Sequence, residues 1–118
     1  MKISYLDDLK KLLDQAHPGL ASSGELDFKG VFGAVAGFVD GNIFVTCGKF
    51  GVALKLPSET LEELLKEKDV ERLRYFPKGH IKKEYVVLPE RILKNERLLK
   101  VLLDESIRYV SAHENAAG

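Results

Sequence analysis

Cysteine and histidine are scarce in this chain of 118 residues. It contains one cysteine, Cys47, and three histidines, so an internal disulfide is excluded and no Cys/His cluster has the spacing of a zinc site. A lone thiol also suits a reducing compartment. We therefore expect no metal and no cofactor.

Long hydrophobic runs and a net charge are missing as well. Nowhere do about 18 uncharged apolar residues stand together, and the N-terminal segment MKISYLDDLKK lacks the apolar stretch of a secretory signal. The 18 basic and 18 acidic side chains cancel, so no global field would draw nucleic acid or anionic lipid to the protein. These absences favour a cytoplasmic protein with no membrane partner.

The length and the ordinary mixture of residues favour one folded domain. Hydrophobic residues make up 45% of the chain and charged residues 31%, a balance that argues against disorder except at the C-terminal end. We expect a single domain over residues 1–112 and a flexible tail over residues 113–118.

Apolar residues at helical spacing mark three segments. The first covers residues 5–16, with Ser4 as its N-cap. The second begins near Ser58, a candidate cap, and the third follows Pro89, with Asn95 as an internal cap. Each segment is predicted to lay an apolar stripe against a sheet.

From Phe28 onwards the pattern changes to short runs rich in Val, Phe, Ile and Gly, which are typical of strands. Asp40 and Gly41 separate two such runs, and a type I′ turn needs positive φ at both central residues, which glycine adopts freely and aspartate tolerates. A second reversal at CGKFG leads into a third strand. After the second helix, RLRYF and KKEYVVL are predicted to form another hairpin.

The predicted order is helix, three strands, helix, two strands, helix. Because the helices flank two antiparallel groups of strands, a two-layer α+β fold with an antiparallel sheet is favoured over a parallel, doubly wound sheet.

Most residues with reactive side chains fit structural roles. The glycines between residues 33 and 51 precede strands and turns instead of a helix, so they do not predict a phosphate-binding loop. Cys47 stands at a strand end and is expected to be buried and inert. The histidines are scattered along the chain, at His17, His80 and His113. No catalytic set is therefore predicted.

One segment, RLRYFPKGHIKKEY, interleaves basic and aromatic residues. Such a surface binds an acidic partner protein or a single-stranded nucleic acid, whereas the structural alternative is an exposed hairpin whose lysines protect a sheet edge. The candidate partner-binding residues are Arg72, Arg74, Tyr75, Lys78, Lys82, Lys83 and Tyr85.

Two stretches, VFGAVAGFVDGNIFV and FPKGHIKKEYVVLPERILKN, resemble the TfoX N-terminal domain family. That family has an FGG-like turn, a VDG hairpin, a strand with Phe, and later a tyrosine-bearing strand that ends in VPE or LPE before a helical tail. The residues at matching places are Phe32, Gly33, Val39, Asp40, Gly41, Phe44, Leu54, Lys55, Tyr85, Leu88, Pro89 and Glu90. Two positions depart from the pattern, Ala34 in place of a glycine and Val35 in place of an aromatic residue.

The resemblance, over about Lys29 to Val110, implies the topology given above in a secretion-chaperone-like fold, and it implies no catalysis. Members related to the competence regulator act with a cyclic-AMP receptor protein to switch on DNA-uptake genes, and they are longer proteins with a second, C-terminal domain. The resemblance thus implies an accessory role in transcription.

Three functional hypotheses follow. The leading one is a non-enzymatic protein-interaction module, which includes the case of a homodimer and uses the basic and aromatic hairpin or an exposed sheet edge. The second is a small-molecule binder or small enzyme with a site between sheet and helices, drawing on Cys47, Lys55 and Tyr85. The third is direct nucleic-acid binding through Lys82 and Lys83.

Overall fold

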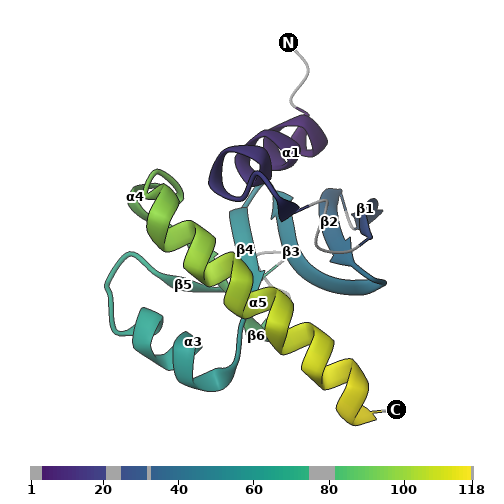
Figure 1. Ribbon diagram of the computed structural model, residues 1–118. Coiled ribbons are helices and arrows are strands. Elements are labelled where there is room, and N and C mark those ends of the chain that lie inside the picture. Colours follow the sequence, from purple (N-terminus) through teal and green to yellow (C-terminus); the bar gives the residue numbers. More distant parts are fainter. Residues whose placement is uncertain (1–3, 21–24, 32, 75–81, 118) are drawn as a thin grey trace.

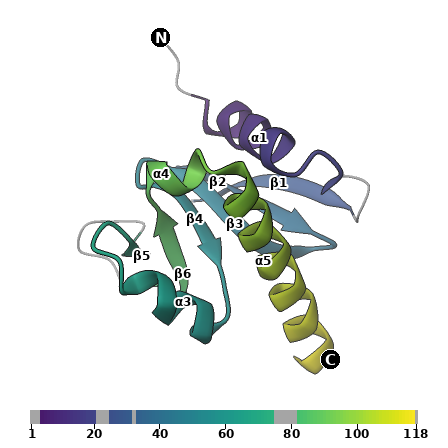
Figure 2. The same cartoon turned by 60° about the vertical axis from the view of Figure 1, so that its left-hand side comes forward.

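In the part of the chain that the structure describes, six antiparallel strands form one sheet, and helices cover one of its faces (Figures 1 and 2). A computed structural model of the protein describes residues 4–20, 25–31, 33–74 and 82–117. The strands lie in the order β1-β2-β3-β4-β6-β5. The elements are α1 (Tyr5–Ala16), β1 (Leu26–Val31), β2 (Ala34–Val39), β3 (Asn42–Gly48), β4 (Gly51–Lys55), α3 (Ser58–Leu65), β5 (Glu71–Leu73), β6 (Lys82–Leu88), α4 (Glu90–Leu93) and α5 (Glu96–Ala117).

The predicted two-layer α+β class with an antiparallel sheet is confirmed, but four strands, not three, precede α3. The segment predicted as one strand from Phe28 is divided into β1 and β2, which pair in regular register. Gly33 lies between them with φ of 77°, a conformation that glycine adopts without steric cost. This backbone reversal adds the edge strand β1.

The hairpin between β2 and β3 is confirmed. Asp40 and Gly41 have φ of 50° and 82°, so both central residues are in the left-handed region that a type I′ turn requires. The Asp40 carboxylate also accepts a hydrogen bond from the Glu25 backbone N–H at 2.8 Å, and the Asp40 N–H donates to the Glu25 carbonyl at the same distance. The turn therefore fixes the start of β1.

Helix boundaries follow the predicted caps in two of three cases. Ser4 Oγ accepts a hydrogen bond from the Asp7 N–H at 3.2 Å, and Asn95 Oδ1 accepts one from the Leu98 N–H at 3.2 Å, which separates α4 from α5. At α3 the prediction was wrong by one residue, because Pro57 occupies the N-cap and Ser58 is already helical. Proline has no N–H to leave unsatisfied at such a position.

The main hydrophobic core lies between the sheet and the helices. Helix α5 packs against β3 and β4, α1 against β2 and β3, and α3 against β6. A buried hydroxyl reinforces this packing, since Ser106 Oγ on α5 lies 3.0 Å from the Phe44 carbonyl oxygen and 2.6 Å from that of Lys55. A hydroxyl hydrogen donates to one of these acceptors at a time. The contact fixes the long helix across neighbouring strands.

A second, smaller cluster of buried side chains lies on the other face of the sheet. Ala53 is fully buried and stands between Val52 and Leu54, which point into the main core, so it faces the opposite way. Leu73 and Tyr85 are buried beside it, and half-buried Phe50 and Val87 pack against them.

Among the helices of the described residues, none has the length and apolar character that crossing a bilayer would require.

Candidate protein-interaction surface

A groove of about 520 Å³ lies beside the β5 edge of the sheet, where α3 ends. Its walls combine apolar side chains with charged ones that are exposed to solvent. The apolar residues are Phe50, Leu65, Val70 and Val87, and the charged residues are Glu71, Arg72 and Arg74. We call this feature the β5 groove.

The predicted partner-binding residues fall into three groups. Arg72, Arg74 and Lys83 are exposed on or next to β5 and β6, and the first two line the β5 groove. Lys82 begins β6, but its side chain lies outside the described part of the chain, as do Tyr75 and Lys78 entirely. Tyr85 points into the buried cluster on the face of the sheet away from α5, with only 9% of its surface exposed.

Strand β5 is short and irregular. It has three residues, its one partner among the described strands is β6, and its register shifts between Arg72 and Leu73. The Arg72 guanidinium donates a hydrogen bond to the Lys83 carbonyl oxygen at 3.2 Å. This bond holds the side chain along the edge, because a guanidinium with several donors can satisfy one acceptor and still present the others.

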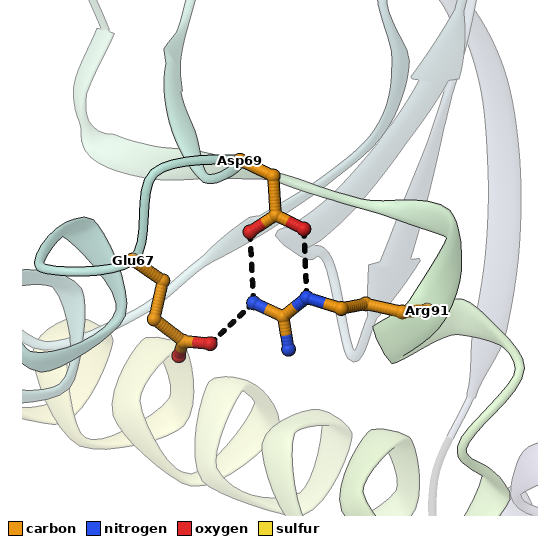
Figure 3. Close-up of polar contacts among 3 residues, drawn as sticks. All are labelled: Glu67, Asp69 and Arg91. Carbon is orange, nitrogen blue, oxygen red and sulfur yellow. Dashed lines mark hydrogen bonds and ion pairs between the residues drawn. The ribbon is translucent and has the colours of Figure 1, made fainter.

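An ionic bracket fixes the segment that leads into β5 (Figure 3). The Arg91 guanidinium on α4 donates from Nε to one carboxylate oxygen of Asp69 at 2.7 Å and from Nη2 to the other at 2.8 Å, and Nη2 also donates to Glu67. These hydrogen bonds lower the pKa of Asp69 and raise that of Arg91. The bracket therefore joins the α3–β5 connection to α4.

A polar cluster at the C-terminal end of β4 and the N-terminal end of β6 was not predicted. Glu84 accepts a hydrogen bond from the Tyr109 hydroxyl at 2.6 Å and lies 3.5 Å from the Lys55 ammonium. Burial, followed by the hydrogen bond to Glu84, raises the pKa of Tyr109 to about 12. No sequence spacing marks these residues, which come from three different elements.

Cys47 has the properties expected of an inert thiol. It is 5% exposed and belongs to the main core, and burial, together with the negative charge of Asp8, raises its pKa. Lys55 and Tyr85 are cross-strand partners, with the ammonium 6.0 Å from the ring centroid. The structure does not bring Cys47 to them, because Tyr85 belongs to the cluster on the other face.

The histidines are not brought together in the described residues. His17 caps the C-terminus of α1, and its Nε2 lies 2.6 Å from Asp104 Oδ1 on α5. His80 lies outside the described residues, and His113 is in α5 with a side chain that is likewise not described. Across the described ranges, no group of three metal-ligating side chains is found.

The turns and strands that carried the family resemblance are all in place in the described part of the fold. The sequence of residues 19–110 matches the family described as TfoX N-terminal domain. The chain belongs to the TfoX N-terminal domain family. No curated protein of similar sequence was found. In this TfoX N-terminal domain, the matched segment contains all six strands, so it includes both edges of the sheet and the β5 groove.

Proposed function

We propose that this TfoX N-terminal domain is a non-enzymatic protein-interaction module that binds a partner protein in the β5 groove. The observation that carries the proposal is the combination of an apolar floor with exposed arginines at the β5 edge of the sheet. Specific interfaces are built in this way, with an apolar centre, a polar rim and a frequent use of arginine.

The charges of the groove define the kind of partner. Arg72 and Arg74 both line the groove, and among its described lining residues they outnumber the acidic ones, of which there is Glu71. Because the whole chain has no net charge, the attraction is local and acts at short range. A surface with an apolar side chain for the floor and carboxylates for the arginines fits this site.

The shape of β5 favours recognition by side chains. An edge of three residues with a register shift offers a partner strand few backbone groups in line. Affinity should therefore come from the apolar floor and from the guanidinium groups.

Membership of the TfoX N-terminal domain family supports a more specific role. On this proposal the domain is an accessory protein of transcription or competence regulation, located in the cytoplasm, and its partner belongs to that machinery.

The test is affinity capture from a native extract at low salt, with identification of any partner recovered in stoichiometric amounts. The double variant Arg72→Glu, Arg74→Glu should lose that partner. The matched control, Arg97→Glu with Lys100→Glu, reverses two exposed charges on α5 and should retain it. The proposal fails if wild type recovers no stoichiometric partner, or if both double variants lose it equally.

A second candidate function is the binding of a small anionic molecule, and the volume of the β5 groove favours it. Ligand sites in proteins commonly measure ~300–1,000 Å³, so a groove of about 520 Å³ falls in this range. Small carboxylates and phosphates tested by thermal shift would raise the unfolding midpoint of wild type but not of the Arg72→Glu, Arg74→Glu variant. Direct nucleic-acid binding is tested by titration with a labelled single-stranded oligonucleotide. That alternative predicts an affinity for the oligonucleotide that falls steeply as the salt concentration rises.

A further inference from the structure

Strand β1 forms the edge of the sheet opposite to β5 (Figures 1 and 2). Its six residues pair along their whole length with β2, and within the described residues no strand lies on its other side. Asp27, Lys29 and Gly30 are exposed, and Leu26 and Phe28 are half-buried. The edge is thus long, regular and accessible.

The hydrogen-bonding pattern shows which backbone groups of β1 face outward. The Glu25 carbonyl accepts from the Asp40 N–H across the sheet, so residue 25 bonds toward β2. In an antiparallel ladder such pairs alternate, and Asp27 and Lys29 therefore bond inward as well. Leu26, Phe28 and Gly30 then direct their N–H and C=O groups away from β2.

One of these outward groups is already occupied. The Phe28 N–H donates to the carboxylate of its neighbour Asp27 at 2.9 Å. This contact confirms that the Phe28 N–H points away from β2. It also places a replaceable acceptor on the edge, because the carboxylate of an exposed residue can leave the N–H when a carbonyl of another strand takes its place.

The order of charges along β1 is complementary to itself. Asp27 and Lys29 are two residues apart and share the face of the sheet away from α1, whereas Phe28 points toward α1, where the Lys10 ammonium lies 5.6 Å from its ring centroid. When a second copy of β1 runs antiparallel with Phe28 on the two-fold axis, Asp27 stands opposite Lys29 of the partner subunit. Symmetry then creates the same pair twice.

We propose that the protein forms a symmetric homodimer in which the β1 strands of two copies pair antiparallel about Phe28 and continue the sheet. The outward residues Leu26, Phe28 and Gly30 then oppose one another across the interface, and each such pair exchanges two hydrogen bonds. This inference does not rest on the proposed function, because the β5 groove is at the other edge.

Neighbouring registers are excluded by hydrogen bonding and by charge. Sliding the second copy by one residue would place residues whose N–H and C=O groups point outward opposite residues whose groups point toward β2, so these pairs could not exchange hydrogen bonds. A shift of two residues in one direction places Asp27 opposite Asp27 of the partner subunit, and in the other direction Lys29 opposite Lys29 of the partner subunit. Like charges directly opposite each other destabilise strand pairing, so the register about Phe28 is selected.

The decisive experiment is a charge exchange followed by sedimentation at protein concentrations from ~10 μM to ~1 mM, the range in which a small interface is measurable. Wild type should dimerise. Asp27→Lys alone and Lys29→Asp alone should each weaken the dimer by at least ~10-fold, since both symmetric pairs become repulsive. The double variant Asp27→Lys, Lys29→Asp should restore the homodimer, and an equimolar mixture of the two single variants should form a heterodimer.

Loss of the dimer in both single variants together with its recovery in the double variant is specific to this register, because only here does position 27 of one copy face position 29 of the other. A wild type that stays monomeric at ~1 mM, single variants that dimerise as wild type does, or a mixture without heterodimer would each overturn the proposal.

Wild type alone provides a second measurement that needs no variant. Amide exchange of Leu26, Phe28 and Gly30, followed residue by residue, should slow as the protein concentration rises, while amides of β5 should not change. Exchange at these three residues that is independent of concentration contradicts the dimer, whether or not the variants fold.

Discussion

The two edges of this sheet are built on different principles. Strand β1 has six residues in unbroken register with β2, and its exposed charges alternate in sign. Strand β5 has three residues, a register shift and an apolar groove beside it. A long regular edge such as β1 is therefore suited to pairing with another strand, whereas a short irregular edge such as β5 is suited to recognition through side chains.

Each edge is also guarded in its own way. On β1 the Phe28 N–H donates a hydrogen bond to the Asp27 carboxylate. Next to β5, the Arg72 guanidinium donates one to the Lys83 carbonyl oxygen of β6. Such local contacts protect unpaired backbone groups from indiscriminate association. They leave room for a partner that offers better hydrogen bonds.

The largest loss of stability is expected from truncating the buried side chain that anchors the short edge strand β5. Leu73 is fully buried although β5 is short, so Leu73→Ala should lower the free energy of unfolding by ~2–5 kcal/mol. Leu26→Ala at the half-buried position on β1 is the matched control and should cost ~1 kcal/mol. Urea unfolding measures both. Equal losses would show that β5 is no better anchored than β1.

The next largest loss of stability is expected on β2, the strand that pairs with β1. A Cβ at Gly37 would lie 2.7 Å from Val45 Cγ1, so Gly37→Ala forces a shift in the core and should cost ~1–3 kcal/mol. At Gly30, on β1 itself, the nearest atom to a Cβ is 3.9 Å away, and Gly30→Ala should change stability by less than ~0.5 kcal/mol. Thermal unfolding of the two variants distinguishes them; a neutral Gly37→Ala would refute the close approach.

A smaller effect is expected at the turn that fixes the start of β1. Asp40→Gly keeps positive φ accessible but removes the acceptor for the Glu25 N–H, which should cost ~0.5–1.5 kcal/mol. Asp40→Asn retains a carbonyl acceptor and should stay close to wild type. Exchange of the Glu25 amide should accelerate in Asp40→Gly only. If both variants accelerate it, the carboxylate charge is the stabilising element.

The smallest effect should come from the ionic bracket before β5. The folded pKa of Asp69 lies below its unfolded value of 3.8, so the stability it contributes is present above that value and is lost as pH falls through the folded pKa. Arg91→Gln should therefore be slightly less stable than wild type at about pH 7, and the difference should shrink as pH is lowered below 3.8 and through the folded pKa. Thermal unfolding over this pH range measures it.

The control for the bracket is Arg97→Gln, which neutralises an exposed arginine of α5. Its difference from wild type should not change with pH in the same range. A pH-independent deficit of Arg91→Gln would mean that the arginine stabilises the fold by packing, not by its carboxylate partners.

Local signals in the sequence were sufficient for much of the fold. The Ser4 cap, the turn at Asp40 and Gly41, and the Asn95 cap each depend on residues close together in the chain, and each was predicted. The family resemblance marked a turn at Gly33, but the number of strands was wrong, because the residues before and after that turn are the same β-forming types.

The candidate surface could be predicted only in part. The basic character of Arg72 and Arg74 is visible in the sequence, but the apolar floor is not, because Phe50 comes from the turn between β3 and β4 and Leu65 from α3. The Arg91 bracket and the bond between Tyr109 and Glu84 likewise join residues that are distant in the chain. Side-chain contacts of this kind are decided by tertiary packing, for which no periodicity exists.

The position of α5 has a consequence for protein synthesis. The strands β2, β3 and β4 are made early, yet the helix that covers β3 and β4 and carries Ser106 is made after all six strands. A nascent chain on the ribosome therefore displays an apolar sheet surface until α5 leaves the exit tunnel. The protein must complete its fold after translation of that helix, and holding chaperones have a defined surface to cover until then.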